Sequence, residues 1–432
     1  MTKRFQPTTT TSELDVCVGK AGLLAGHLTY HQAGAREYSG FGYDNGWLAS
    51  PECFEISPDL PLNGGYQTRR PPSKADSTFF LALADTEPDA WGRRVIARAH
   101  AKERQSNPEL RPLTELDYLC AVDDFSRVGA LRLRAAGGGY LRTVDEGRRR
   151  TPPLLELEHM LAASRAVERR EETAADLQYL LGKGTSLGGM RPKCTVLHDN
   201  GRLALAKFPS INDTRSVTRG EVLALHLATA AGIDAAIARI VVIEDSPVAI
   251  IDRFDRTADH GRIPYLSGSS VLQAQRSEER AYTEVVDEMR ARCADPVKDA
   301  RELWRRLVFN HLILNVDDHL QNIGFLHVGG GQWRLSPAFD LNPFPDKTNE
   351  SKTWLSEDTG PITSVRQLLR SAPYFNLDDV AARAVLADLV RALSDWRRVA
   401  LGPDVGMRVN ELDDFIPALE GAALQEARQL LA

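Results

Sequence analysis

Hydrophobic and polar positions alternate with a short period in the first part of this chain and with a helical period in much of the rest. Before residue 153, short alternating segments rich in glycine and aromatic residues predict small twisted strands, as in LDVCVGKAGLLAGHLTY and GFGYDNGWLA. One helix is expected around Trp91 to Lys102. A glycine run and then polar residues, from Ala135 to Pro153, predict a linker. We therefore expect an N-terminal α+β domain at residues 1–153.

After the linker, the pattern predicts a small antiparallel sheet accompanied by helices. Helices are expected at Leu154 to Leu181 and Thr218 to Ala231, and strands at Lys193 to Leu197, Arg202 to Phe208, Ile240 to Ile243 and Val248 to Ile251. The first two strands flank an Asn-Gly pair, which is the strongest short-range signal for a hairpin. Gly232 predicts the end of the second helix. This domain is placed at residues 154–255.

The last part of the chain, residues 256–432, is expected to form a mainly helical lobe. It contains a strongly apolar helix from Trp304 to Leu314 and one hairpin, formed by Ile323 to Val328 and Gln332 to Leu335. Amphipathic helices are expected to the C-terminus. No period of about 20–50 residues repeats along the chain, which argues against a solenoid or a propeller.

Composition and charge exclude several classes of protein. Hydrophobic residues make up 43% and charged residues 26% of the chain, which is typical of a soluble folded protein. The net charge of −6 gives no chain-wide sign that nucleic acid is the principal ligand. The five cysteines are odd in number and lack CxxC spacing, which argues against a disulfide framework and a zinc site. No signal peptide and no apolar run of about 18 residues is found, so we expect a cytoplasmic protein that is neither exported nor membrane-spanning.

The most informative polar segment is NVDDHLQN, Asn315 to Asn322, between the apolar helix and the hairpin. Asp317 and Asn322 are separated by four residues, as are the aspartate and the magnesium-binding asparagine of a protein-kinase catalytic loop. A hairpin returns the chain to its starting end, so Asn322 before it and Asp340 after it should be neighbours. Two protein oxygens, completed by phosphate and water, suit Mg²⁺ bound with ATP.

Two other interpretations of this segment stay open. In one, Asp317, Asp318 and Asn322 cap a helix and form a turn, and the adjacent histidine is an ordinary loop residue. In the other, the chain is a metal-dependent hydrolase with the ligands Asp317, Asp318, His319 and Asp340. The hydrolase lacks a second histidine at ligand spacing.

A kinase also requires a phosphate-binding loop, a strand lysine and a hinge before the catalytic loop, and the sequence has candidates for these in the right order. Residues Gly182 to Lys193 are rich in glycine, which lets backbone N–H groups approach phosphate oxygens. Lys207 lies on the second hairpin strand, where its ammonium could reach phosphates along the sheet. The segment Asp252 to Arg256 leaves the sheet where a kinase hinge would bind adenine through its backbone. This order favours an ATP-dependent phosphotransferase over the hydrolase.

Two roles are open for Glu221, which opens the helix after the first hairpin. It could pair with Lys207, as the helix-C glutamate of a kinase pairs with the strand lysine. The run Thr218-Arg219-Gly220-Glu221 also fits a capping box, in which the glutamate accepts a bond from the N-cap amide. We favour the capping box.

Together these motifs resemble one family, the HipA-type serine/threonine kinases, which are toxins of bacterial toxin–antitoxin pairs. The segments that carry the resemblance are Asn315 to Asn322, Ser336 to Leu341, Ser186 to Lys193, Phe79-Phe80, Pro88 to Arg94 and Ser126 to Leu131. The resemblance covers most of the chain. It implies an α+β, two-lobed protein-kinase-like fold with an extra N-terminal α+β subdomain and a mainly helical C-terminal lobe.

The resemblance also implies roles for single residues. Asp317 would be the catalytic aspartate, and Asn322 and Asp340 would hold Mg²⁺. The implied ATP contacts are Gly188, Gly189, Met190, Arg191, Pro192, Lys193 and Lys207 at the phosphates, Asp252, Arg253 and Phe254 at the adenine, and His319 in the catalytic loop. In the family, a serine at the position of Ser186 is autophosphorylated, which expels the loop and inactivates the enzyme. Ser186 is therefore the expected regulatory phosphosite, with Thr185 as a substitute.

The implied function is that of an ATP- and Mg²⁺-dependent protein kinase acting as a toxin. Its substrate would be a translation component such as an aminoacyl-tRNA synthetase, and its partner a helix-turn-helix antitoxin that brings it to operator DNA. A small-molecule kinase and a nucleotide-binding co-repressor without turnover stay open as alternatives. Val316 stands at the place of the arginine in the kinase HRD motif, so activation through a phosphorylated loop docking on that arginine is not expected.

Overall fold

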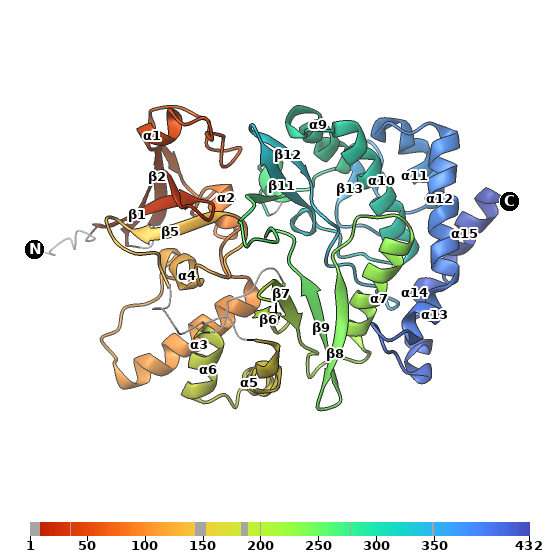
Figure 1. The fold of residues 1–432 in the computed structure, drawn as a ribbon, viewed down its shortest axis with the longest axis horizontal. Coiled ribbons are helices and arrows are strands. Elements are labelled where there is room, and N and C mark those ends of the chain that lie inside the picture. The colour runs from red at the N-terminus through yellow and green to blue at the C-terminus, as the bar shows by residue number, and fades with distance from the viewer. Residues whose placement is uncertain are drawn as a thin grey trace, which may run out of the picture.

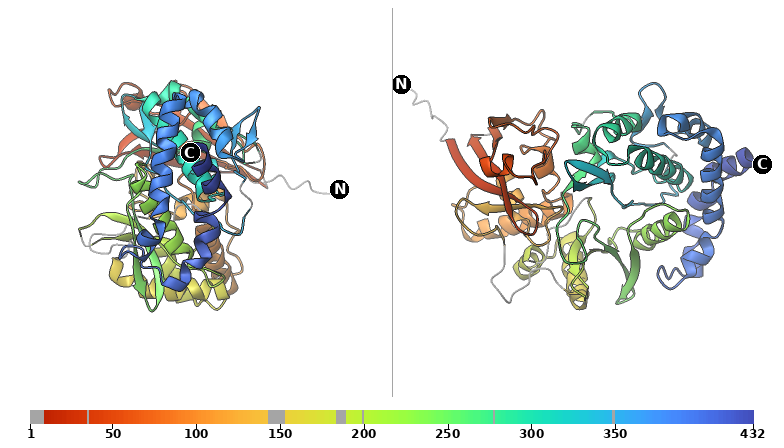
Figure 2. Two further views of the ribbon diagram at one scale, coloured as in Figure 1. Left: turned by 90° about the vertical axis from the view of Figure 1, so that its right-hand side faces the viewer. Right: turned by 45° about the horizontal axis from the view of Figure 1, so that its top comes forward.

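The computed structural model describes residues 9–34, 36–142, 153–182, 189–198, 200–276, 278–347 and 350–432. From the N- to the C-terminus, the chain passes from an antiparallel sheet domain through a smaller sheet to a helical lobe (Figures 1 and 2). The predicted linker residues Arg148, Arg149 and Arg150 lie outside the described residues, as do Thr185, Ser186 and Gly188.

The N-terminal domain is built on an antiparallel five-stranded sheet in the order β4-β3-β2-β1-β5. Its elements are β1 (Thr9–Val18), β2 (Leu23–Ala33), β3 (Arg36–Tyr43), α1 (Asn45–Leu48), β4 (Tyr66–Arg69), α2 (Leu81–Ala84), α4 (Glu115–Ala121) and β5 (Leu131–Ala135). The pairing of β1 with β2 is irregular between Val16 and Cys17. Alternate residues such as Val16, Leu28 and Phe41 are buried in a core that includes Phe79. Strands are confirmed in this region, but β1 and β2 are 10 and 11 residues long, and Asn45–Leu48 of the second predicted segment form helix α1.

Helices on both sides of the predicted linker pack together at the lower edge of Figure 1. They are α3 (Ala90–Ser106), α5 (Leu157–Arg169) and α6 (Ala174–Gly182). Trp91 and Val95 of α3 share an apolar cluster with Val167 and Leu177 of the other two helices. Arg98 adds hydrogen bonds to the carbonyl oxygen of Val167 and to Glu172. The start of α3 is thereby fixed beside the second sheet.

The second sheet has the strand order β6-β7-β9-β8 and is antiparallel. Its elements, with the helix between them, are β6 (Lys193–Leu197), β7 (Leu203–Lys207), α7 (Val217–Ala230), β8 (Ala238–Ile243) and β9 (Ser246–Asp252). Helix α5 covers one face, where Met160 packs in a cluster with Ala204 and Ile250. On the other face, Val222 of α7 shares the main core with Ala249. The two predicted hairpins and the predicted helix are confirmed.

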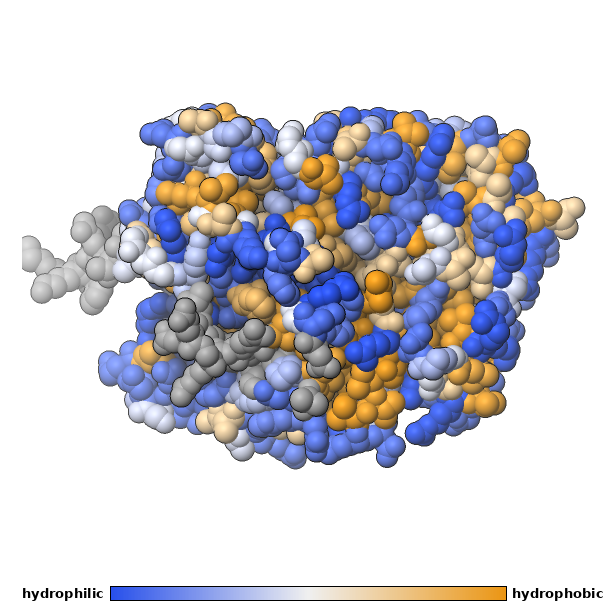
Figure 3. Space-filling view, in the orientation of Figure 1, coloured by the Kyte–Doolittle hydropathy of each residue, from blue (hydrophilic) through white to orange (hydrophobic). Residues whose placement is uncertain are grey.

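Edge strand β8 leaves apolar side chains on the surface. Figure 3 shows apolar residues gathered on this face over the position that β8 and β9 occupy in Figure 1. Ile237 and Val242 are among the large apolar residues that are exposed. The backbone N–H of Ile240 donates to the carbonyl oxygen of Asp404, so a C-terminal segment covers part of this edge.

The C-terminal lobe surrounds the buried helix α10 (Pro296–Leu312), whose Trp304 indole donates to the carbonyl oxygen of Leu368. The other helices are α8 (Gly268–Val271), α9 (Tyr282–Arg292), α11 (Val365–Ser371), α12 (Asp379–Ser394), α13 (Trp396–Leu401), α14 (Ile416–Leu419) and α15 (Ala422–Leu431). The strands are β10 (Tyr265–Ser267), β11 (Gly324–Gly329), β12 (Gln332–Leu335), β13 (Trp354–Ser356) and β14 (Gly360–Pro361). Every helix in the described part of the chain is too short or too polar to cross a bilayer.

A buried histidine in α10 makes the stability of the lobe depend on pH. Burial lowers the pKa of His311 to about 4, whereas an unfolded histidine titrates near 6.5. Below about pH 6.5 the unfolded chain binds a proton that the folded chain does not bind, so stability falls as the pH falls toward 4. We expect His311 to account for a loss of about 2 kcal/mol in the free energy of unfolding between pH 7.5 and 5.

Urea unfolding of the wild type and of His311→Gln at both pH values measures this contribution. The variant should lose less stability on acidification than the wild type. His260→Asn, which removes an exposed histidine, should behave as the wild type. Equal acid losses in the wild type and His311→Gln would contradict the assignment.

Candidate active site

Lys207, at the end of β7, stands at the centre of an ion triad in which Lys207 and Glu221 are buried and Asp340 is partly buried. Its Nζ donates to Oε1 of Glu221 at 2.5 Å and to Oδ1 of Asp340 at 2.8 Å. Glu221 lies on α7, and Asp340 follows β12 with φ of 55°. Strand β7, helix α7 and the segment after the β11–β12 hairpin therefore meet at one ammonium group.

Lys207 and Asp340 stabilise each other in their charged forms. Burial by itself would lower the pKa of Lys207, but Asp340 and Glu221 more than compensate and raise it. Burial would raise the pKa of Asp340, and the ammonium groups of Lys207 and Lys193 lower it instead. Burial raises the pKa of Glu221, against the opposing effect of Lys207. An ionised Asp340 carboxylate beside a fixed ammonium is suited to bind a metal–phosphate complex.

The capping-box interpretation of Glu221 is wrong. Helix α7 begins at Val217 after Ser216, so Thr218 is already inside the helix and its hydroxyl donates to the carbonyl oxygen of Pro247. Glu221 lies one turn further along, on the face of α7 turned to the sheet, where Lys207 stands. Pairing with a buried ammonium satisfies this buried carboxylate better than a bond to a backbone amide would.

A second lysine lies beside the first on the neighbouring strand. Lys193 of β6 pairs directly with Lys207 in the strand register, and both side chains are buried. The Nζ of Lys193 is 3.4 Å from Oδ2 of Asp89, which also caps α3 by accepting from the backbone N–H of Gly92. Burial and the nearby Lys207 lower the pKa of Lys193. Two closely spaced ammonium groups create a region that attracts anions.

The described part of the predicted phosphate loop lies directly before these lysines. Gly189 has φ of 95°, a backbone conformation that favours glycine, and a Cβ there would lie 2.7 Å from Nζ of Lys193, so a larger residue would displace that ammonium. Met190 is exposed, while Arg191 forms two contacts with Asp213, at 2.8 and 2.7 Å. The carbonyl oxygen of Pro192 accepts from the N–H of Phe208 at 2.9 Å. These contacts fix the end of the loop to the sheet.

The segment after α10 presents Asp317 at the surface. Nδ2 of Asn322 donates to the carbonyl oxygen of Asp317 at 2.8 Å, which holds both ends of the segment together. The carboxylate of Asp317 is 36% exposed, accepts from Nζ of Lys352 and has Nε2 of His319 at 3.9 Å. Asp317 is thus accessible to a hydroxyl substrate. The short 3-10 turn Leu320–Asn322 has no side-chain cap, which argues against a purely capping role for the segment.

Asp318 points away from Asp317 into the lobe. Its carboxylate accepts from the hydroxyl of Tyr282 at 2.8 Å and from the backbone N–H of Lys352 at 2.7 Å. Burial raises the pKa of Asp318 to about 6. Among the residues that the structure describes, no three histidine, cysteine or acidic side chains are grouped as metal ligands, so the four-ligand set of the hydrolase interpretation is not assembled.

Asn322 stands just before β11 and Asp340 follows β12, and the antiparallel pairing of these strands returns the chain toward its starting end. Asn322 and Phe339, the neighbour of Asp340, line the same cavity of about 30 Å³. Burial lowers the pKa of His319, and Asp317 and Asp340 both act against this effect, so both carboxylates lie near the imidazole. The amide oxygen of Asn322 and the carboxylate of Asp340 are hard oxygen donors, which fit Mg²⁺ completed by phosphate and water.

The predicted adenine-side residues point in three directions. Asp252 faces the α5 side of the sheet, with Oδ1 2.8 Å from Nε2 of His198 and Oδ2 3.3 Å from Arg202. The ring of Phe254 lies 5.5 Å from that of Phe339, next to Asp340. Arg253 is buried and donates to Asp255. Phe254 is thus linked to the ion triad through Phe339, the residue before Asp340.

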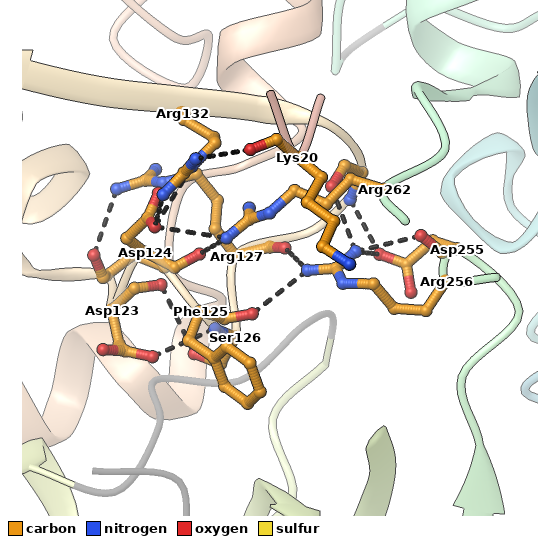
Figure 4. Close-up of polar contacts among 12 residues, drawn as sticks. Lys20, Asp123, Asp124, Phe125, Ser126, Arg127, Arg132, Asp255, Arg256 and Arg262 are labelled. Atoms are coloured by element: carbon orange, nitrogen blue, oxygen red, sulfur yellow. Dashed lines mark hydrogen bonds and ion pairs between the residues drawn. The ribbon is translucent and has the colours of Figure 1, made fainter. Parts of the chain in front are cut away.

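The N-terminal domain forms hydrogen bonds with Asp255 and Arg256, which follow the predicted adenine-side residues (Figure 4). Asp255 accepts from the backbone N–H of Gly129 at 2.8 Å, and Arg256 donates to the carbonyl oxygen of Arg127 at 2.7 Å. Burial would raise the pKa of Asp255, but Arg253 and Arg256 lower it. The segment that leaves β9 is therefore fixed by backbone groups of the first domain.

Comparison with known proteins identifies the part of the chain that carries this site. Residues 185–396 match the HipA-like C-terminal domain. This part of the chain belongs to the HipA-like family. It contains every candidate site residue described above from Gly189 to Asp340, together with Lys352. A search of the curated proteins finds no match.

Two solved structures resemble the HipA-like chain as a whole or in part. HipA of Shewanella oneidensis MR-1, solved with HipB and its operator DNA, has a TM-score of 0.64 and 16% identity, covering 96% of this chain and 97% of that one. The proinflammatory kinase CtkA of Helicobacter pylori has a TM-score of 0.43 and 14% identity, covering 57% and 94%. The likeness to HipA extends over the N-terminal domain as well, and the predicted fold class is confirmed.

Two contacts of the HipA-like site were not predicted from the sequence: Asp89 with Lys193, and Lys352 with Asp317. A third contact, Glu221 with Lys207, was one of two interpretations and was not the favoured one. Asp89 belongs to the segment Pro88 to Arg94, whose resemblance to the family was a usable signal. Glu221 had a competing local interpretation, and nothing near Lys352 in the sequence indicated its contact.

Proposed function

We propose that this HipA-like chain is an ATP- and Mg²⁺-dependent protein serine/threonine kinase. The observation that carries the proposal is the bond of Lys207 to both Glu221 and Asp340. In protein kinases, the corresponding lysine–glutamate ion pair and metal-binding aspartate must both be in place for phosphoryl transfer. Asp317 and Asn322 stand on the segment before the hairpin that leads to Asp340.

Each residue of the site has a separate role in phosphoryl transfer. Lys207 and Lys193 bind the phosphates of ATP, and backbone N–H groups of the loop ending at Lys193 orient them. Asn322 and Asp340 would hold Mg²⁺, which would neutralise negative charge on the phosphates. Asp317 accepts a hydrogen bond from the acceptor hydroxyl, orients it for attack and takes its proton as the new O–P bond forms. Positioning and electrostatics supply most of the catalysis.

The biological role that we propose is that of the toxin of a toxin–antitoxin pair in the cytoplasm. The likeness to HipA, which was solved with HipB and operator DNA, supports a helix-turn-helix antitoxin and operator DNA as partners. A translation component such as an aminoacyl-tRNA synthetase is the proposed substrate, on the family resemblance alone. Autophosphorylation of Ser186 or Thr185 is the proposed means of inactivation, since a phosphate there would repel the phosphates of ATP.

The test is phosphate incorporation into the purified chain itself. The chain is first treated with phosphatase and then incubated with ATP and Mg²⁺, and its intact mass and modified residues are determined. We expect a gain of one phosphate on Ser186 or Thr185, and no gain when EDTA removes the metal. ATP binding without any transfer would favour the co-repressor, and transfer to a metabolite but not to protein would favour the small-molecule kinase.

A further inference from the structure

A lysine from a distant part of the chain reaches the candidate catalytic aspartate. Nζ of Lys352 donates to Oδ1 of Asp317, and the two residues are 35 positions apart in the sequence. The backbone N–H of the same lysine donates to Oδ1 of Asp318 at 2.7 Å. Side chain and backbone of Lys352 therefore contact two successive aspartates of the catalytic segment.

The backbone around Lys352 is anchored from several sides. The hydroxyl of Thr353 donates to the carbonyl oxygen of Asp318 at 2.8 Å, and Tyr282 of α9 holds the carboxylate of Asp318 from the interior. The backbone N–H of Trp354 donates to the carbonyl oxygen of Arg280 at 3.0 Å. The side chain of Lys352 is nevertheless 58% exposed. The backbone of Lys352 is therefore fixed, whereas its exposed side chain can change rotamer and move the ammonium group.

The other cationic groups of the site are already engaged elsewhere. Lys207 is held by Glu221 and Asp340, and Lys193 pairs with Asp89. The Nε2 atom of His319 is 3.9 Å from Oδ1 of Asp317, beyond hydrogen-bond distance. Among the described residues, Lys352 is the cation in contact with the carboxylate of Asp317.

Transfer of a phosphoryl group to a hydroxyl beside Asp317 requires positive charge at that place. The carboxylate and the phosphoryl oxygens are both negative, and they approach each other as the hydroxyl is attacked. A lysine ammonium that contacts both would offset this repulsion, and it would act most strongly on the charge that develops in the transition state.

We propose that Lys352 is a further catalytic residue, which leaves part of its contact with Asp317 and binds the phosphoryl group during transfer. In this step the bond between the γ-phosphorus and the bridging oxygen breaks and ADP leaves with the electron pair. The acceptor oxygen forms the new bond to phosphorus, and its proton goes to Asp317. Asp318 positions Lys352 through the backbone N–H. The inference rests on the proposed kinase function.

Lys352→Ala, Lys352→Arg and the control Lys347→Ala test this role. Lys347 is an exposed lysine of the same segment. The readouts are the first-order rate constant of phosphate incorporation at saturating ATP, at one fixed protein concentration, and the affinity for a non-hydrolysable ATP analogue. We expect Lys352→Ala to lower the rate constant by about 10²-fold, as loss of one transition-state donor does, with analogue affinity little changed. Lys352→Arg should recover part of the rate, and Lys347→Ala should match the wild type.

The outcomes separate this inference from the proposed function. Absence of incorporation in the wild type itself would remove the proposed function. An active wild type with an equally active Lys352→Ala would overturn the inference alone. A faster Lys352→Ala would also overturn it, because Lys352 would then be a group that blocks Asp317. Thermal unfolding of each variant shows whether a lost rate reflects a lost fold, and Lys352→Arg keeps the test informative if Lys352→Ala is unstable.

Discussion

Replacement of Asp317 by alanine is expected to abolish phosphoryl transfer while leaving the fold intact. The Asp317 carboxylate is partly exposed, and its side-chain contacts are with Lys352 and, at 3.9 Å, His319. Surface ion pairs of this kind contribute little to stability. Loss of the group that accepts the proton should lower the rate by about 10²- to 10⁴-fold. Labelled ATP and intact mass, each with the wild type in parallel, measure the effect.

Two matched variants sharpen this experiment. Asp317→Asn keeps the shape of the side chain but cannot take a proton at neutral pH, and should be nearly as inactive as Asp317→Ala. Asp358→Ala removes an exposed aspartate in the turn between β13 and β14 and should leave the rate unchanged. Binding of an ATP analogue should survive in all three variants, since Asp317 acts on the acceptor. Undiminished transfer by Asp317→Asn would rule out Asp317 as the proton acceptor.

Replacement of Lys207 by methionine is expected to damage both stability and nucleotide binding. The change removes the ammonium that neutralises Glu221 and Asp340 and leaves two carboxylates close together with Glu221 buried. Removal of one partner from a buried ion pair costs about 3–5 kcal/mol. Urea unfolding should show a loss of this size, and binding of an ATP analogue should fall because a phosphate contact is lost.

A double variant distinguishes the structural role of Lys207 from its chemical role. In Lys207→Met with Glu221→Met, apolar side chains replace the buried pair, so most of the lost stability should return. Asp340 stays partly solvated, with a side chain that is 24% exposed, and can bear its charge without the lysine. Phosphoryl transfer should not return. A double variant that regains both stability and full transfer would show that Lys207 has no role at the phosphates.

Local patterns in the sequence were sufficient for the elements on which the site is built. The Asn-Gly pair between two apolar runs predicted the β6–β7 hairpin, because a tight turn of that kind joins neighbouring antiparallel strands. The spacing of Asp317 and Asn322 and their place before a hairpin predicted that Asn322 and Asp340 lie near each other. Periodicity predicted helix α7, and Gly232 predicted its end; in the structure Gly232 has φ of 77°. Each of these inferences depends on residues close together in the chain or on one hairpin.

Contacts between distant segments could not be predicted in the same way. The sequence around Glu221 is compatible with a capping box and with an ion pair, and only the packing of α7 on the sheet places its carboxylate at Lys207. The pairing of Asp89 with Lys193 depends on how α3 packs beside the second sheet. The position of Gly129 at Asp255 depends on how two domains meet.

The sequence by itself determined the kind of site, its order along the chain and most of its chemical groups. Only the tertiary structure decided which charges neutralise one another and that Lys352 stands at Asp317. The physical reason is that an ion pair becomes strong and specific when burial removes competing water, and burial is a property of the packed fold. Local spacing carries no information about it.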